Sequence, residues 1–288
     1  MEYPASTLER LTDGAAAALG DVFVGAYLHG SFGGGYADEW SDVDFVVLTT
    51  RDVNPEEETR LQTFHGQLYA DGVKPWAQRL EGSYAPIELF RTIDPERTPF
   101  LYLDNGSSHL ERDPHCNNAV IRHQVREGSI VLAGPDPKEL VPPVDPNVLR
   151  DEARAAMEND YAAWFENDGE RFNRWAQTYL VLTLCRLLFT ARTGEVAGKA
   201  EAAAWGEREL DPAWARLIRQ AITERGDPSS VEARIPADPG VLSATRGFVA
   251  YALAQVARRE PGLLKGELNL TADFGDLPDG FDAFSAER

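Results

Sequence analysis

Two short features near the start of the chain constrain its fold more than any other. Gly30 and Ser31 begin a glycine-rich turn at the end of an apolar run, 22–28, which is typical of a buried strand. After a short polar link, Asp42 and Asp44 open a second apolar run. Backbone amides in such a turn can approach an anion closely, and carboxylates two positions apart on a strand share one face at about 7 Å. The combination predicts a divalent cation that bridges the two aspartates to a phosphate.

A third carboxylate is expected on a neighbouring strand, predicted at 76–84 and closed by Pro86. Side-chain alternation places Glu81 on the opposite face from the apolar residues of this strand, where a metal site would need it. Glu88 is the alternative acid, but it lies beyond the proline and is less suited to keep the strand's register. A surface glutamate on an edge strand is the competing interpretation of Glu81.

The Gly-Ser turn followed by Ser-Asp-x-Asp resembles the motif of the nucleotidyltransferase superfamily that includes the β-type DNA polymerases. The match covers roughly residues 20–90. It implies that Gly30 and Ser31 hold the phosphates of a nucleotide and that Asp42 and Asp44 hold two Mg²⁺ ions.

Composition narrows the class of partner. The 288 residues carry a formal charge of −19, which would repel a nucleic-acid backbone and favours small or cationic partners. Solubility is the competing explanation for this charge. No apolar run approaches the roughly 20 residues of a membrane span, and no secretory signal is visible. With two cysteines that lack metal-site spacing, the chain is expected to be a cytoplasmic protein without nucleic-acid or membrane partners; its oligomeric state is left open.

Five prolines between residues 134 and 146 predict an extended linker and a domain boundary. We expect an α+β fold, with a mixed-sheet nucleotidyltransferase domain at 1–143 and an all-helical bundle at 147–260. The acidic tail, 261–288, is expected to be disordered or to lie over the body. Periodicity predicts a strand at 129–133. His65 is expected on a solvated helix face. Residues 95–115 show no clear periodicity. The predicted helices are 5–19, 54–72, 118–127, 148–165, 172–192, 199–210, 212–225 and 241–258.

The second half carries a more specific resemblance. The stretches 178–186, 193–199 and 202–205, together with 127–140, resemble the aminoglycoside adenylyltransferases, which modify streptomycin and spectinomycin. This resemblance extends over roughly residues 20–225.

Matching positions in that family imply roles for individual residues. Ser31, Ser41, Arg186 and Lys199 would contact the phosphates of ATP, and Glu81 would be the catalytic glutamate. Arg186 also stands out physically, because a charge in an otherwise apolar helix is costly without a partner. An ion pair within the protein is the competing interpretation for both cations.

The resemblance weakens at the drug-binding positions. Trp175 occupies the place of the family's tryptophan, but no acid is adjacent to it, and Glu166 and Asp168 lie upstream. Ile222 replaces the aromatic residue expected beside adenine. The candidates for acceptor binding are Trp175, Glu166 and Asp168.

The sequence thus predicts a Mg²⁺-dependent enzyme that moves AMP from ATP to a hydroxyl of a cationic aminoglycoside, a reaction that confers antibiotic resistance. The site is expected in the cleft between the domains, with Glu81 as general base and as a further metal ligand. Two alternatives stay open. One is a nucleotidyltransferase with another acceptor, and the other is a regulator that binds nucleotide without turnover.

Overall fold

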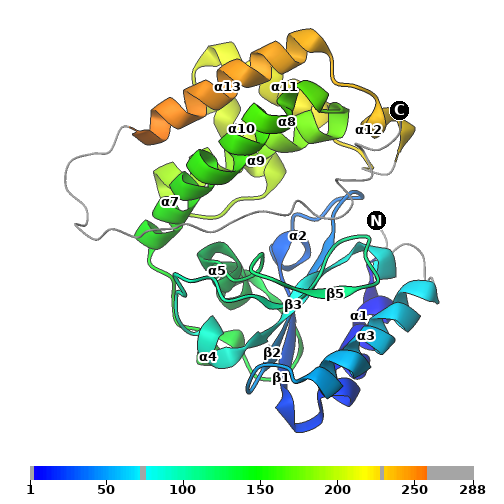
Figure 1. Cartoon of the computed structure of the whole chain (residues 1–288). Coiled ribbons are helices and arrows are strands. Elements are labelled where there is room, and N and C mark those ends of the chain that lie inside the picture. The colour runs from blue at the N-terminus through cyan, green and yellow to red at the C-terminus, as the bar shows by residue number, and fades with distance from the viewer. Residues whose placement is uncertain (1–2, 72–75, 228–229, 258–288) are drawn as a thin grey trace. The chain divides into compact units, whose positions relative to one another are not determined.

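The computed structural model describes residues 3–71, 76–227 and 230–257 (Figure 1). Within them the chain forms two compact units that divide between Val144 and Asp145. The acidic tail 261–288 and the helix end predicted at Gly72 lie outside the described residues. In the described part of the chain, every helix is too short or too polar to cross a bilayer.

The first unit contains a six-stranded mixed sheet, in the order β5-β4-β3-β2-β1-β6. Strands β2 and β3 are parallel, and the other neighbours are antiparallel. The strands are β1 (Phe23–Leu28), β2 (Val43–Thr49), β3 (Leu80–Pro86), β4 (Phe100–Leu103), β5 (Leu110–Asp113) and β6 (Ile130–Ala133). The α+β fold with a mixed sheet is therefore confirmed.

Helices cover both faces of this sheet. Val43, Phe45 and Val47 of β2 pack in one buried cluster with α1 (Ala5–Leu19) and α3 (Pro55–Ala70). Val46 and Leu48 alternate with them and belong to a second cluster. That cluster includes residues of α4 (Ile87–Phe90) and α5 (Ala119–Gly128). Because Asp44 alternates in the same way as Val46, its side chain leaves the strand on the α4/α5 face.

Two local predictions in this unit need correction. Residues Trp76–Arg79 form a 3-10 turn rather than the start of a strand, so Arg79 does not belong to β3. The proline-rich linker contains a turn of helix, α6 (Pro137–Leu140), which begins at Asp136 because that side chain accepts a hydrogen bond from the Lys138 amide.

The prediction that His65 is solvated is also wrong. Its side chain is buried, and Nε2 lies 2.7 Å from the hydroxyl of Tyr84 on β3. The sequence pattern of α3 does not indicate that His65 is buried, because its hydrogen-bond partner, Tyr84, lies on a strand that is distant in the sequence.

The second unit is helical, and α9 (Arg174–Thr193) is its central element. This helix is apolar on nearly all sides and packs against the helices before and after it. Gly194, with φ 75°, ends it as a left-handed C-cap, as predicted. The other helices are α7 (Pro146–Ala155), α8 (Ala162–Asp168), α10 (Lys199–Glu209), α11 (Ala215–Glu224), α12 (Val231–Arg234) and α13 (Pro239–Ala257).

The helix predicted at 148–165 is not uniform. A π-helical stretch, Ala156–Tyr161, joins α7 to α8. Such stretches widen the helix locally and often occur at functional sites. Here it brings Tyr161 to a ring-centroid distance of 6.4 Å from Tyr179 of α9.

Candidate active site

The register of β2 and β3 brings two of the predicted acids together. Asp44 pairs directly with Glu81 across the parallel strands, and the preceding pair, Val43 and Leu80, is buried in the core. Paired residues on neighbouring strands project from the same face at about 5 Å. The core residues therefore fix the direction of both carboxylates.

The glycine turn lies against the first of these acids. Gly30 has φ 58°, and a Cβ built on it would lie 2.0 Å from Asp44 Oδ2. The amide of His29 also donates to the backbone carbonyl of Asp44 (2.9 Å). Gly30–Gly33 form one helical turn, α2, whose first amides have no acceptor within a helix. Glycine at this position thus lets a phosphate-sized anion and the Asp44 carboxylate approach the same backbone.

Asp42 lies one residue before β2 and is held from the turn that follows β4. Asn105 Nδ2 donates to Asp42 Oδ1 at 2.5 Å. Gly106 stabilises this turn, because it adopts φ 86° and donates its amide to the carbonyl of Gln78 (3.0 Å). Asp42 is partly buried, so its orientation is set by the fold and not by solvent.

Glu81 is surrounded by polar side chains and does not point into bulk solvent, since its side chain is only 20 % exposed. The Tyr102 hydroxyl lies 3.1 Å from Glu81 Oε1 and 3.1 Å from Asp104 Oδ1. His115 Nε2 lies 3.3 Å from the same Glu81 oxygen.

The surroundings of Glu81 shift the pKa values of neighbouring side chains. Burial, and then the negative charge of Glu81, raise the pKa of Asp104 to about 6. Partial burial lowers the pKa of His115, but the hydrogen bond and charge of Glu81 outweigh it and raise that pKa above its usual value. Burial also lowers the pKa of His29 to about 4, so this histidine is neutral at physiological pH. A cluster of shifted groups beside carboxylates is typical of a catalytic centre.

The other predicted residues of this unit have the following surroundings. Ser31 is partly buried in α2, next to Gly30. Ser41 is buried, and its hydroxyl lies in a local turn with Asp38, donating to Asp38 Oδ1 at 3.2 Å. Glu88 is exposed and pairs with Arg91 at 2.8 Å, which favours Glu81 as the third acid.

The donor set suits Mg²⁺. Within residues 3–71, 76–227 and 230–257, no three His, Cys, Asp or Glu side chains are grouped so that they could hold one ion together. Mg²⁺ does not need such a cage, because proteins commonly hold it through one or two carboxylates plus substrate phosphates. Asp42 and Asp44, beside a turn where Gly30 leaves no room for a side chain, match this requirement.

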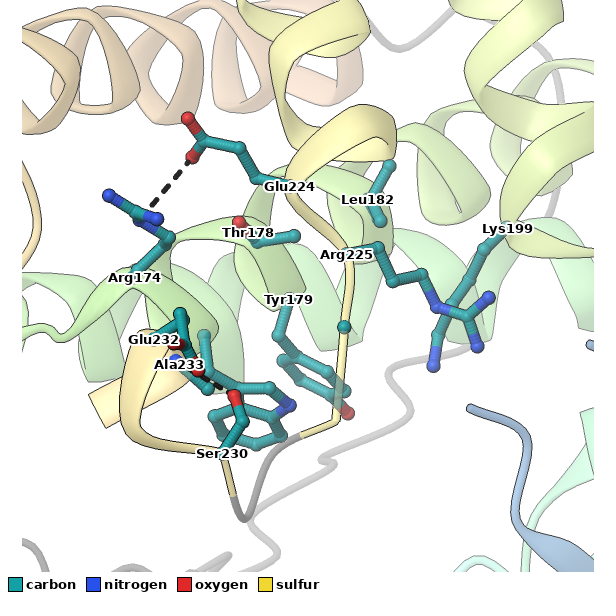
Figure 2. A pocket seen from close by; sticks show the side chains of 12 residues that line it. Arg174, Thr178, Tyr179, Leu182, Lys199, Glu224, Arg225, Ser230, Glu232 and Ala233 are labelled. Atoms are coloured by element: carbon teal, nitrogen blue, oxygen red, sulfur yellow. Dashed lines mark hydrogen bonds and ion pairs between the residues drawn. The ribbon is translucent and has the colours of Figure 1, made fainter. Parts of the chain in front are cut away.

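A pocket opens in the helical unit beside α9 (Figure 2). Trp175 and Tyr179 are stacked in its wall, with ring centroids 5.1 Å apart and planes at 22°. Lys199 Nζ lies 5.6 Å from the Tyr179 ring centre, a cation–π distance. The buried hydroxyl of Thr178, which also lines the pocket, has no hydrogen-bond partner among the described residues.

Charged side chains of both signs line the same pocket. Arg174 pairs loosely with Glu224 (4.0 Å), and burial lowers the pKa of Arg225. The structure thus brings together two predicted residues, Trp175 and Lys199, which lie 24 positions apart in the sequence.

The remaining candidates in this unit lie elsewhere. Glu166 is exposed, and Asp168 pairs with Arg171 at 3.3 Å. Arg186 is partly buried two turns further along α9 than Tyr179, and its charge acts on Tyr161. The acids of the pocket are instead Glu224 and Glu232.

Comparison with known proteins finds relatives among the adenylyltransferases that modify antibiotics. The family described as "Aminoglycoside adenylyltransferase, C-terminal domain" matches residues 139–240. A spectinomycin 9-adenylyltransferase of Staphylococcus aureus is 27 % identical over 201 residues, which are 65 % of this chain and 72 % of the relative. An aminoglycoside (3'') (9) adenylyltransferase of Klebsiella pneumoniae is 25 % identical over 215 residues, covering 70 % and 78 % of the two chains.

The fold has a solved counterpart. The crystal structure of spectinomycin adenyltransferase AAD(9) from Enterococcus faecialis with ATP and spectinomycin covers 87 % of this chain and 99 % of its own, with a TM-score of 0.63 and 16 % identity. The likeness shows that the chain has the fold of this adenyltransferase, a mixed sheet followed by a helical unit. More narrowly, residues 139–240 match the C-terminal domain of the aminoglycoside adenylyltransferases, and the chain is similar to members of that family over about two thirds of its length.

Four polar residues of the site were not predicted from the sequence. Tyr102, Asp104, Asn105 and His115 all lie in the region 95–115, which gave no clear pattern. A signal existed for three of them: the apolar run of β4, Phe100–Leu103, contains Tyr102 and is followed directly by Asp104 and Asn105, much as Asp42 directly precedes β2.

Proposed function

We propose that the protein is a Mg²⁺-dependent adenylyltransferase that moves AMP from ATP to a hydroxyl group of an aminoglycoside. The observation that carries the proposal is the direct pairing of Asp44 with Glu81 beside the Gly30 turn. The match of residues 139–240 to the C-terminal domain of the aminoglycoside adenylyltransferases supports the nucleotide half of the reaction, and the relatives named for aminoglycosides and spectinomycin support the acceptor.

The chain's own residues divide the chemistry as follows. Glu81 accepts the proton of the acceptor hydroxyl while the oxygen of that hydroxyl bonds to the α-phosphorus of ATP. The bond between the α-phosphorus and the oxygen that bridges it to the β-phosphate breaks, and pyrophosphate departs. Gly30 and Ser31 contact phosphate through the α2 turn. When bound by Asp42 and Asp44, Mg²⁺ would offset negative charge on the attacking and leaving oxygens.

Further contacts with the nucleotide are proposed for Ser41, Arg186 and Lys199. Matching family positions support all three, and the position of Lys199 in a pocket wall with Tyr179 supports the last. Cations here would balance the charge of the pyrophosphate group.

The acceptor is proposed to contact Trp175, whose partly exposed ring suits a sugar or cyclitol ring. Glu166 and Asp168 remain candidates for its ammonium groups. A net charge of −19 would attract a polycation of this kind.

A test of the whole proposal uses labelled ATP with a panel of aminoglycosides and measures pyrophosphate release. Glu81→Gln is expected to leave ATP affinity nearly intact and to abolish transfer, because it removes the proton acceptor but keeps the shape. Glu88→Gln is the matched control, since Glu88 is an exposed acid of the same segment, and it is expected to keep full activity. Drug-dependent pyrophosphate release that survives Glu81→Gln would refute the assigned role.

One observation favours a second candidate, a nucleotidyltransferase with a different acceptor. The pocket in the helical unit contains three cations, Arg174, Lys199 and Arg225, against two acids, which suits a polycation poorly. Release of pyrophosphate with none of the aminoglycosides, but with a less basic hydroxyl compound, would favour this candidate. ATP binding without any metal-dependent turnover would instead indicate a nucleotide-binding regulator.

A further inference from the structure

Two side chains outside the family's acidic motif meet the same atom of Glu81. The Tyr102 hydroxyl lies 3.1 Å from Glu81 Oε1, and His115 Nε2 lies 3.3 Å from it. Because both contacts are made to Oε1, they fix the rotation of the carboxylate and hence the direction of Oε2. Charge-assisted hydrogen bonds of this kind are the stronger ones in proteins.

Tyr102 reaches this position through strand pairing. It lies on β4 directly opposite Ser83 of β3, and Glu81 is two residues from Ser83 on the same face. Diagonal neighbours of this kind are within reach of a long aromatic side chain. Tyr102 is buried, so its ring is held by packing and its hydroxyl is delivered to one place.

A phenol carries one proton, and the Tyr102 hydroxyl faces two carboxylates. Asp104 Oδ1 also lies 3.1 Å from it, two residues further along the chain. The hydroxyl donates to one acid at a time. A second donor on Glu81 is therefore needed to hold its carboxylate whenever Tyr102 donates to Asp104, and His115 occupies that place.

His115 is itself anchored. Its amide donates to Asp113 Oδ1 (2.6 Å), its carbonyl accepts from Asn118 Nδ2 (2.7 Å), and its ring lies against that of Tyr102, with centroids 5.3 Å apart. The side chain is nonetheless 46 % exposed, so it contributes little to the core. An exposed imidazole whose backbone amide and carbonyl are both fixed, and which is aimed at a carboxylate, is suited to positioning rather than to packing.

We propose that Tyr102 and His115 are positioning residues that hold Glu81 in the orientation in which it accepts the proton of the acceptor hydroxyl. The inference rests on the proposed role of Glu81 as general base. It adds to that role a pair of donors supplied by β4 and by the segment before α5, which act through Glu81 and not on the nucleotide.

The test compares Tyr102→Phe and His115→Gln with the wild-type enzyme in steady-state pyrophosphate release, using an aminoglycoside that the enzyme accepts. Each variant is expected to lower kcat about 10-fold, and the double variant about 100-fold, because a misplaced catalytic group loses rate in this range. The KM for ATP is expected to stay within about twofold of the wild type, since only a step after binding is affected. Calorimetric affinity for ATP with Mg²⁺ is a second readout and is expected not to change.

The same substitutions are repeated in the Glu81→Gln background, at high enzyme concentration and over long incubations, so that the small residual rate of pyrophosphate release can be compared. If Tyr102 and His115 act through Glu81, they cause no further loss there, since coupled residues are not additive. Tyr84→Phe and His109→Gln are the matched controls: Tyr84 is a buried tyrosine that contacts His65 instead, and His109 is an exposed histidine of the neighbouring segment. Both are expected to keep the wild-type kcat.

The outcomes distinguish the inference from the proposed function. Wild-type kcat in both variants, with Glu81→Gln inactive, would overturn the positioning role and leave the proposed function standing. A further 10-fold loss in the Glu81→Gln background would also overturn it. Equal activity of wild type and Glu81→Gln would overturn the role of Glu81 as general base and the inference together. Absence of aminoglycoside-dependent pyrophosphate release by the wild type would overturn the proposed function itself. If Tyr102→Phe does not fold, His115→Gln decides alone, because its side chain is half-exposed.

Discussion

Replacing Gly30 by alanine is expected to damage the site by an amount that follows from the geometry. Gly30 has φ 58°, and its added Cβ would lie 2.0 Å from Asp44 Oδ2, whereas real Cβ contacts are essentially never below 3.0 Å. The carboxylate must therefore retreat from 2.0 Å to at least 3.0 Å. A displacement of about 1 Å in a reacting group costs on the order of 100-fold in rate, or roughly 3 kcal/mol.

The backbone adds a separate cost that shows in stability. A residue with a Cβ in the left-handed region is less stable than glycine there by about 1–2 kcal/mol. Gly20 supplies the matched control, because it has φ 57° and no atom lies within 4 Å of the place that its Cβ would take. Gly20→Ala is expected to lose stability through its positive φ as well, with unchanged activity.

The assay measures pyrophosphate release and urea unfolding for both variants side by side. Both variants are expected to lose unfolding free energy, but only Gly30→Ala is expected to lose activity, falling about 100-fold below Gly20→Ala in kcat/KM. Equal kcat/KM in the two variants would refute the reasoning, because it would show that the position of the Asp44 carboxylate does not matter to the reaction.

Two further predictions concern the metal and the core. Removing divalent cations with EDTA is expected to stop pyrophosphate release, and Mg²⁺ to restore it, because Asp42 and Asp44 bind phosphate only through a cation; release that persists in EDTA would exclude the metal role. Burial lowers the pKa of His65 to about 3, so between pH 6.5 and pH 5 the unfolded chain binds a proton that the folded chain does not, and stability falls by about 2 kcal/mol. Urea unfolding at both pH values should show this loss reduced by about that amount in His65→Gln, and an unchanged pH dependence would contradict the assignment.

The residues that could be predicted are those whose chemistry is local in the sequence. Gly30, Asp42 and Asp44 lie within one short segment, and Glu81 follows from alternation along a single strand. The order of helices and strands follows from periodicity for the same reason. The fold class and the resemblance to the aminoglycoside adenylyltransferases were therefore within reach of the sequence alone.

The residues that could not be predicted meet their partners only through pairing of distant segments. Tyr102 contacts Glu81 because β4 runs antiparallel to β3, and His115 arrives from beyond β5. His65 was assigned to the wrong environment because its partner, Tyr84, is 19 residues away. A single helix pattern carries no information about such a contact.

The last strand of the sheet has a consequence for synthesis on the ribosome. Strands β2 and β3, which carry the acids, are complete by Pro86, but β1 gains its second neighbour only when β6, Ile130–Ala133, has been translated. Until then one edge of β1 has an unfilled row of backbone donors and acceptors, which can pair with another nascent chain. Truncated products that end before Ile130 therefore retain Asp44 and Glu81 but expose this unpaired strand edge, and so are predisposed to aggregate.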